Sequence, residues 1–356
     1  MVKKNLLYHL KFWAGLLFAQ FLLFYFLPKS SFVISKFKII FEAKQAIQEK
    51  IFSKINSSFG DFFYLFIALI LIYIFFKILI KNSRKEYLLL FLIILNISYL
   101  IYQISWGMLY FQKPIVEKLS KKEITKKEIE KLALYYIYLT NKTRENVSED
   151  KNGIFKIKNL KNLKTNILKS HSSIPKEFQA FSATETTNFK PSLWGNLMNY
   201  SGILGYYNPF TGEAQYNENL PNTYIPFTLA HENSHQLGFA REEEANFIGF
   251  LICENSKIPE LQYSAYLYTS KSLLKQIAQY NPEFAIHALQ FFSKKVNLDL
   301  RNDKLFTQKY SGFFESFFHI TNDIFLKTNQ QDGSITYSYF IDLLVKYKRK
   351  ESHLTM

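Results

Sequence analysis

Three apolar segments in the first third of the chain constrain its fold more than any other feature. They run from Leu6 to Leu27, from Phe62 to Ile80 and from Leu88 to Tyr110. Each has roughly the 20 residues that an α-helix needs to cross the ~30 Å hydrocarbon core of a bilayer. The first resembles a signal peptide, but Pro28 and Lys29 make a poor cleavage site. We therefore expect three membrane helices within residues 1–112.

The distribution of basic residues predicts which side of the membrane the rest of the chain occupies. Lys3 and Lys4 precede the first segment, and Lys81, Arg84 and Lys85 separate the second from the third. Short basic loops stay in the cytoplasm. Three crossings then place residues 113–356 outside the cytoplasm, in a multi-pass protein of the inner (cytoplasmic) membrane. The lysine-rich stretch 29–61 opposes this orientation, because it would lie outside as well.

The overall charge and the cysteine content narrow the class of protein. The 356 residues carry a net charge of +15, from 44 Lys and Arg against 29 Asp and Glu. The lysines are spread along the chain and no nucleic-acid-binding motif accompanies them, so we expect a lipid bilayer as partner and no nucleic acid. The single cysteine, Cys253, excludes an internal disulfide and a multi-cysteine zinc site.

The run His231-Glu232-Asn233-Ser234-His235 reads H-E-x-x-H. Positions four apart lie on one face of a helix, so His231 and His235 project together and can hold one Zn²⁺ ion. Glu232 is placed to act as general base toward a metal-activated water. Gly238 follows where a helix end is expected. The H-E-x-x-H pattern is short and also arises by chance, so the neighbouring residues must show whether it is a metal site.

A catalytic zinc usually has three protein ligands, and the third must come from outside H-E-x-x-H. Arg241 stands where the metzincin pattern needs a histidine, which argues against that class. The glutamates at 242, 243 and 244 open a second expected helix, 242–253, and a turn at Gly238 would return one of them to the metal. Carboxylates also favour helix N-termini without any metal.

The run Glu242-Glu243-Glu244-Ala245-Asn246 resembles the E-x-x-A-[ND] signature of gluzincin-like peptidases. In that signature the first Glu is the zinc ligand, which implies Glu242. The spacing from His235 is shorter than in many of those families, so Glu243 and Glu244 stay open as alternative ligands.

The segment before the H-E-x-x-H helix, residues 186–222, is rich in Gly, Asn and Pro and predicts irregular structure or short strands. Within it, 212–217 is our candidate for an edge strand that binds a substrate backbone by strand addition. Glu213 is a candidate for substrate contact, although a surface-loop acid explains it equally well. Tyr263 is a candidate to stabilise an oxyanion. With 24 tyrosines in the chain, packing is the simpler explanation for it.

The chain resembles a family of bacterial membrane proteins known as domain of unknown function 3810. The resemblance covers nearly the whole chain and includes the H-E-x-x-H and E-x-x-A-N runs. Other matching runs are Phe59-Gly60-Asp61, Trp106-Gly107-Met108-Leu109-Tyr110, Gly205 to Ala214, Tyr263-Ser264-Ala265-Tyr266 and Asp332-Gly333-Ser334. It implies three membrane helices joined to an extracytoplasmic gluzincin-like domain, and it supplies no substrate.

We therefore expect a mainly α (α+β) protein. Three transmembrane helices would precede a predominantly helical, zincin-like domain with a small edge sheet or irregular substrate-binding segment. The function that we predict is zinc-dependent hydrolysis of peptide bonds in a peptide or protein substrate, with Glu232 as general base. The alternative is a non-catalytic membrane-anchored protein that binds zinc structurally, or a sensor that binds peptides or cell-wall fragments.

Overall fold

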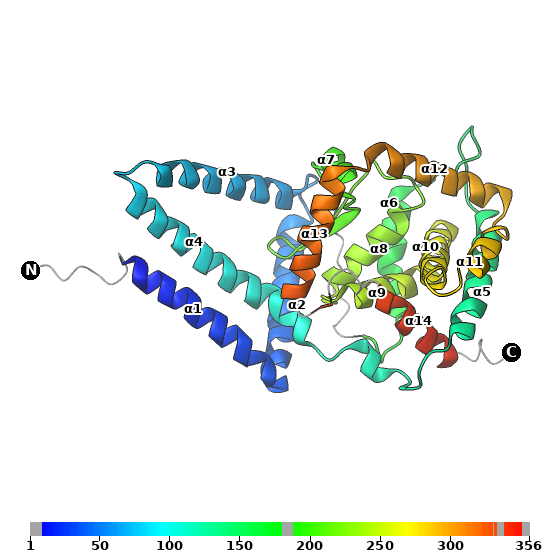
Figure 1. Ribbon diagram of the computed structural model, residues 1–356, viewed down its shortest axis with the longest axis horizontal. Coiled ribbons are helices and arrows are strands. Elements are labelled where there is room, and N and C mark those ends of the chain that lie inside the picture. Colours follow the sequence, from blue (N-terminus) through cyan, green and yellow to red (C-terminus); the bar gives the residue numbers. More distant parts are fainter. Residues whose placement is uncertain (1–8, 180–187, 330, 333–337, 351–356) are drawn as a thin grey trace, which may run out of the picture. The chain divides into compact units, whose positions relative to one another are not determined.

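The computed structural model describes residues 9–179, 188–329, 331–332 and 338–350. The chain divides into two compact units (Figure 1), each described here by itself. The first comprises Met1–Gln112 and Asn208–Gly212, and the second Lys113–Tyr207 and Glu213–Met356. The short segment 208–212 therefore belongs with the first unit, although its neighbours in sequence belong to the second.

The first unit contains the apolar helices. Its helices are α1 (Leu10–Phe26), α2 (Ser31–Phe52), α3 (Phe59–Leu79) and α4 (Arg84–Ser105), with the short 3₁₀ helices η2 (Leu27–Lys29) and η3 (Gly107–Phe111). Among the described residues, three stretches are long and apolar enough to cross a membrane: Leu10–Lys29, Phe59–Leu79 and Arg84–Ser105. This confirms the prediction of three apolar membrane-spanning helices, and we treat the chain as a membrane protein. The predicted residues Leu6 to Tyr8 lie outside the described part.

The last apolar helix is shifted towards the N-terminus relative to its prediction. It ends at Ser105 rather than Tyr110, because Trp106 leaves the helical conformation (φ −150°, ψ −52°) and residues 107–111 tighten into η3. Asn96 in the middle of α4 is buried and links the helix to α1. Its Oδ1 accepts from Gln20 Nε2 (2.9 Å), and its Nδ2 donates to the Trp13 carbonyl (3.1 Å). Such interhelical hydrogen bonds hold membrane helices together.

The stretch 29–61, which the sequence suggested to be a loop, contains the helix α2. Its buried face carries glutamines as well as apolar residues, so the helix lacks the uniform apolar character of a membrane span. This face holds the segment 208–212. Lys44 Nζ donates to the carbonyls of Pro209 (2.9 Å) and Ser105 (3.1 Å), and Gln48 Nε2 donates to Pro209 as well (3.1 Å). Burial lowers the pKa of Lys44 to about 7.

The second unit is mainly helical with one small sheet. Its longer helices are α5 (Lys126–Arg144), α6 (Leu160–Lys169), α8 (Ile225–Gln236), α9 (Glu242–Glu254), α10 (Pro259–Ile277), α12 (Lys294–Tyr310), α13 (Phe313–Thr328) and α14 (Tyr339–Lys350). Shorter elements are α7 (Gly195–Ser201), α11 (Pro282–Leu289), η4 (Ile115–Lys118) and η5 (Ser170–Ser173). In the core, α10 packs along α5, while α8 contacts α9, α10 and β3 (Figure 1).

The sheet has the strand order β1-β3-β2, with β1 (Phe189–Pro191), β2 (Gly205–Asn208) and β3 (Glu213–Tyr216). Strands β1 and β3 are parallel, with Phe189 opposite Ala214. The prediction of short strands before the H-E-x-x-H helix is confirmed, but the choice of edge strand was wrong. The segment 212–217 forms the central strand, because Ala214 and Tyr216 of β3 are drawn into the hydrophobic core. The edges of this sheet are β1 and β2.

A buried ion pair ties three helices of the core together. Arg144 of α5 has no exposed side-chain surface, and its Nε donates to Asp299 of α12 (2.6 Å). Asp299 also accepts from the Phe155 backbone N–H (2.8 Å) and from the Tyr263 hydroxyl of α10. Tyr263 is completely buried, and its hydroxyl is occupied by this network. Its predicted contact with substrate is therefore not supported, because the hydroxyl serves the core instead.

We expect Asp299→Ala to destabilise the protein by about 3–5 kcal/mol, because the buried Arg144 guanidinium loses its buried counter-ion and keeps only the partly exposed Glu149 (3.3 Å). Thermal unfolding of the full chain in detergent measures this loss. Lys350→Ala is the matched control, since Lys350 pairs with Glu177 at the surface (2.8 Å), away from Arg144, and such pairs are worth about 1 kcal/mol or less. Equal effects of the two substitutions would contradict this account.

Candidate metal centre

The H-E-x-x-H run lies on α8, a helix buried on nearly all sides. Pro226 stands in its first turn, where a missing N–H does no harm. The helix ends in a Schellman turn: Gly238 has a left-handed φ of 90°, its N–H donates to His235 O (2.9 Å), and Phe239 N–H donates to Ser234 O (3.2 Å). The prediction that the helix stops at Gly238 is therefore confirmed. This turn reverses the chain and leads directly into α9.

Both histidines present the same ring nitrogen to the site. His231 Nδ1 lies 2.9 Å from Asn246 Oδ1, and His235 Nδ1 lies 2.6 Å from the Phe239 carbonyl oxygen. These oxygens accept hydrogen bonds, so each Nδ1 carries a proton, and in the neutral ring each Nε2 then keeps its lone pair. Partners of this kind fix the tautomer of metal-binding histidines. The two Nε2 atoms are thus prepared to act as ligands.

Glu242, the first residue of α9, faces both Nε2 atoms. Its Oε2 lies 3.3 Å from His231 Nε2, and its Oε1 lies 3.7 Å from His235 Nε2. One carboxylate therefore faces both imidazoles across the α8–α9 turn. Two histidine nitrogens and one carboxylate are a common ligand set of catalytic zinc. The chemistry of this donor set fits a zinc ion.

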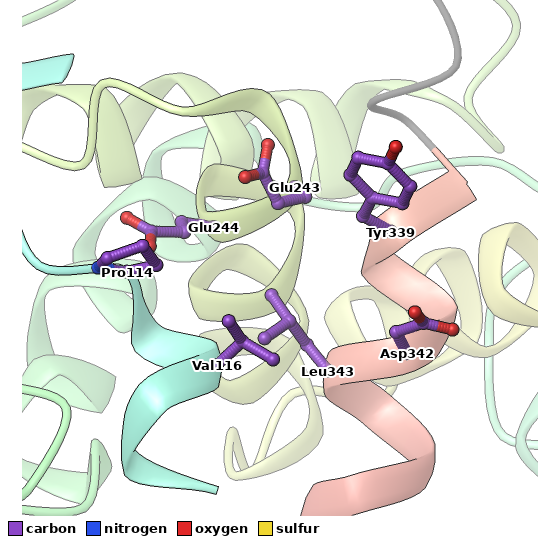
Figure 2. Close-up of a pocket in the computed structure, with 7 residues that line it drawn as sticks. All are labelled: Pro114, Val116, Glu243, Glu244, Tyr339, Asp342 and Leu343. Atoms are coloured by element: carbon purple, nitrogen blue, oxygen red, sulfur yellow. The ribbon is translucent and has the colours of Figure 1, made fainter. Parts of the chain in front are cut away.

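The other two glutamates of the acidic run point elsewhere. Glu244 Oε1 accepts from the Ile115 N–H (2.7 Å) at the start of η4. Glu243 and Glu244 both line a cavity of about 230 Å³ between η4, α9 and α14, with Tyr339 and Asp342 on its far side (Figure 2). Of the three open alternatives, Glu242 is the one that the structure brings to the histidines.

Glu232 lies beside the histidines in a nearly closed environment. Among the described residues, ligand atoms of His231, Glu232 and His235 lie within 4.8 Å of one another. Glu232 is 4% exposed, and its Oε2 is buried without a hydrogen-bond partner. Burial raises the pKa of Glu232 to about 8, opposed by His231 and assisted by Glu242. A buried carboxyl oxygen without a partner is costly, and a carboxyl group with a shifted pKa beside two histidines is a candidate proton acceptor.

The same surroundings shift the two histidines in opposite directions. Burial lowers the pKa of His235 to about 4, which keeps its ring neutral. Burial also acts to lower the pKa of His231, but the hydrogen bond that its Nε2–H donates to Glu242 and the charges of Glu232 and Glu242 outweigh burial and raise this pKa. The two pKa shifts differ because the Glu242 carboxylate is closer to His231 Nε2 (3.3 Å) than to His235 Nε2 (3.7 Å). A metal at this position needs both rings neutral.

Two glycines permit the close approaches that form the site. A Cβ at Gly205 of β2 would lie 2.8 Å from both Glu232 Oε1 and the Gln215 carbonyl oxygen. A Cβ at Gly249 of α9 would lie 3.0 Å from His231 N and 3.2 Å from Ala230 C. The backbone of β2 therefore lies against the Glu232 side chain, and the backbone of α9 lies against that of α8, so a larger residue at either position would force its neighbours to move.

Several residues of the site could not be assigned from the sequence alone. Asn246 stands four residues after Glu242 and thus on the same face of α9, a spacing that could have revealed it as the partner of His231. His171 is buried and bonds Asn233 of α8. Glu213 is fully buried and pairs with Gln215 Nε2 (3.2 Å), so the structure does not present it as a surface group for substrate.

A comparison with protein-family models shows to which family this chain belongs. The model described as Protein of unknown function (DUF3810) matches residues 37–345, which is most of the chain. The chain belongs to the DUF3810 family. Searches of curated proteins and of solved structures gave no match. Within DUF3810, the matched region includes the last two apolar helices together with α8 and α9, so the membrane helices and the candidate metal centre are parts of one family unit.

Gly249→Ala in this DUF3810 protein should lower stability by about 1–3 kcal/mol, because the added methyl group meets backbone atoms of α8 that cannot turn aside. We expect a lower midpoint of thermal unfolding for the full chain. Gly312→Ala is the control, since Gly312 has extended backbone and no atom lies within 4 Å of its added Cβ. An unchanged midpoint for Gly249→Ala would show that α8 and α9 do not pack as described.

Proposed function

We propose that this protein is a membrane-anchored zinc metallopeptidase whose ligands are His231, His235 and Glu242. The observation that carries the proposal is the position of the Glu242 carboxylate, 3.3 and 3.7 Å from the two Nε2 atoms of the H-E-x-x-H histidines. Three such ligands leave a coordination position open for water or substrate. Glu243 occupies a different cavity, which supports an open rather than a closed structural site.

The proposed roles follow from where each side chain lies. A zinc ion bound here would supply a Lewis acid that polarises a carbonyl and makes water a nucleophile near neutral pH. Glu232, which is buried and has an unpaired Oε2, would accept the proton of the attacking water and deliver it to the leaving amine. Asn246 and the Phe239 carbonyl would hold the two imidazole rings in the required tautomer.

The sheet supplies the surface next to this reaction site. Gly205 places the backbone of β2 against Glu232, so a substrate in extended conformation would approach along β2 rather than along the central strand β3. The basic residues between α3 and α4 favour a cytoplasmic location for that connection. The metal centre would then face the outside of the cytoplasm and act on a peptide or protein there.

The proposal is tested by metal content in the purified full chain. We expect about one zinc per chain in the wild type and in Glu232→Gln, and none in His231→Ala, because Glu232 is not a ligand. We also expect hydrolysis of a mixed peptide library by the wild type, followed by mass spectrometry, and loss of at least 10³-fold in Glu232→Gln.

Binding of a hydroxamate distinguishes a zinc site with an open coordination position from a site whose coordination positions are all filled by protein ligands. It should bind the zinc-loaded wild type and Glu232→Gln, but not His231→Ala, in isothermal titration. Zinc binding without hydroxamate binding would favour a structural metal and a non-catalytic protein. Absence of zinc from the wild type, even after incubation with the metal, would contradict the proposal outright.

A further inference from the structure

Helix α13 of the second unit turns its apolar face outward, unlike an ordinary surface helix (orange in Figure 1). Its apolar side chains point into solvent: Phe313 is 79% exposed and Ile320 is 62% exposed. The remaining members of this exposed apolar face are Phe314, Phe317, Phe318, Ile324 and Phe325. A surface helix in a soluble protein turns such a face towards the core.

On the polar side of α13, Glu315 and Asp323 are partly covered, with 28% of each side chain exposed, whereas His319 is 69% exposed. The helix packs against α7, and a side chain at Gly202, just after α7, would meet Glu315 and His319 of α13 at 3.7 and 4.0 Å. One turn from the end, Leu326 is completely buried. The helix is therefore anchored through Leu326 and the edge that carries Glu315, and these contacts set the outward direction of its apolar face.

The exposed apolar face of α13 is too large for an isolated soluble surface. Seven aromatic and aliphatic side chains, each partly exposed, present on the order of 700 Å². The largest apolar patch on a typical monomer is about 300–600 Å² and is often functional. Helix α7 adds to the apolar surface of this part of the unit, because Leu193, Leu197 and Tyr200 are also exposed.

We propose that α13 lies in the plane of the membrane interface, with its apolar face inserted among the lipid chains. The bilayer is the favoured occupant because the same chain carries three helices that can cross it. The last of these ends at Ser105, and Ile115 is already hydrogen-bonded within the second unit. Ten residues span at most about 35 Å, so the second unit is held permanently close to lipid.

The charges of α13 indicate which property of the bilayer it recognises. Its basic residue Lys327 is paired with Asp323 (2.7 Å), and His319 lies 3.9 Å from Glu315. Paired charges leave little attraction for anionic headgroups. Insertion therefore depends on the apolar face and not on lipid charge, in contrast to basic interfacial helices.

The test is a depth measurement on the full chain in phosphatidylcholine nanodiscs. Cys253 is completely buried, so single cysteines at Phe317→Cys and His319→Cys can be spin-labelled, with the unsubstituted chain as blank. These positions lie on opposite sides of α13, and His319 is the more exposed in the structure (69%). Thermal unfolding of both labelled proteins should match that of the wild type.

We expect the label at 317 to collide at least several-fold more often with O₂ than with a water-soluble nickel chelate, and the label at 319 to show the reverse. The ratio of O₂ collisions to nickel-chelate collisions at each label should be the same when the nanodiscs contain anionic phosphatidylglycerol. Equal access of the nickel chelate to both labels would overturn the proposal. If labels at 317 broadened one another's spectra and were inaccessible to both O₂ and the nickel chelate, the face of α13 would be covered by a second copy of the chain. That result would also overturn the proposal. Neither outcome bears on the metal centre.

Discussion

The site depends on one reversal of the chain, the turn between α8 and α9. Only five residues separate Gln236 from Glu242, yet the turn must return a carboxylate to two histidines on the preceding helix. The left-handed conformation of Gly238 makes this possible. The same turn supplies the Phe239 carbonyl that orients His235. Helix termination, ligand orientation and delivery of Glu242 are thus consequences of one local structure.

Burial of this turn and of α8 determines the chemistry of the side chains. A helix in the middle of a domain would normally be apolar, but α8 carries Glu232, His235 and Asn233 into the interior. Burying them is unfavourable unless each polar atom finds a partner. Asn246, Phe239 and His171 provide several of these partners. Glu232 Oε2 remains without one, as does Glu243 Oε2 in the neighbouring cavity.

The sequence predicted features that depend on local spacing and missed those that depend on tertiary contacts. The three apolar helices, the helix end at Gly238 and the short strands follow from composition and periodicity. The place of β3 in the centre of the sheet could not be predicted, because strand order arises from which faces the core covers. The packing explanation given for Tyr263 agrees with its complete burial, but its partner Asp299 could not be named because it is remote in sequence. Nor could the role of Gly249 be seen without its neighbour α8.

The most direct test of the account is X-ray absorption at the zinc edge on the full chain loaded with one equivalent of zinc. The arrangement of His231, His235 and Glu242 predicts two imidazole nitrogens and carboxylate or water oxygens at about 2.0–2.2 Å, in four- or five-fold coordination. The spectrum should lose its imidazole scattering in His231→Ala. A spectrum without imidazole ligands, or with a sulfur near 2.3 Å, would show that the metal is held elsewhere and contradict the account.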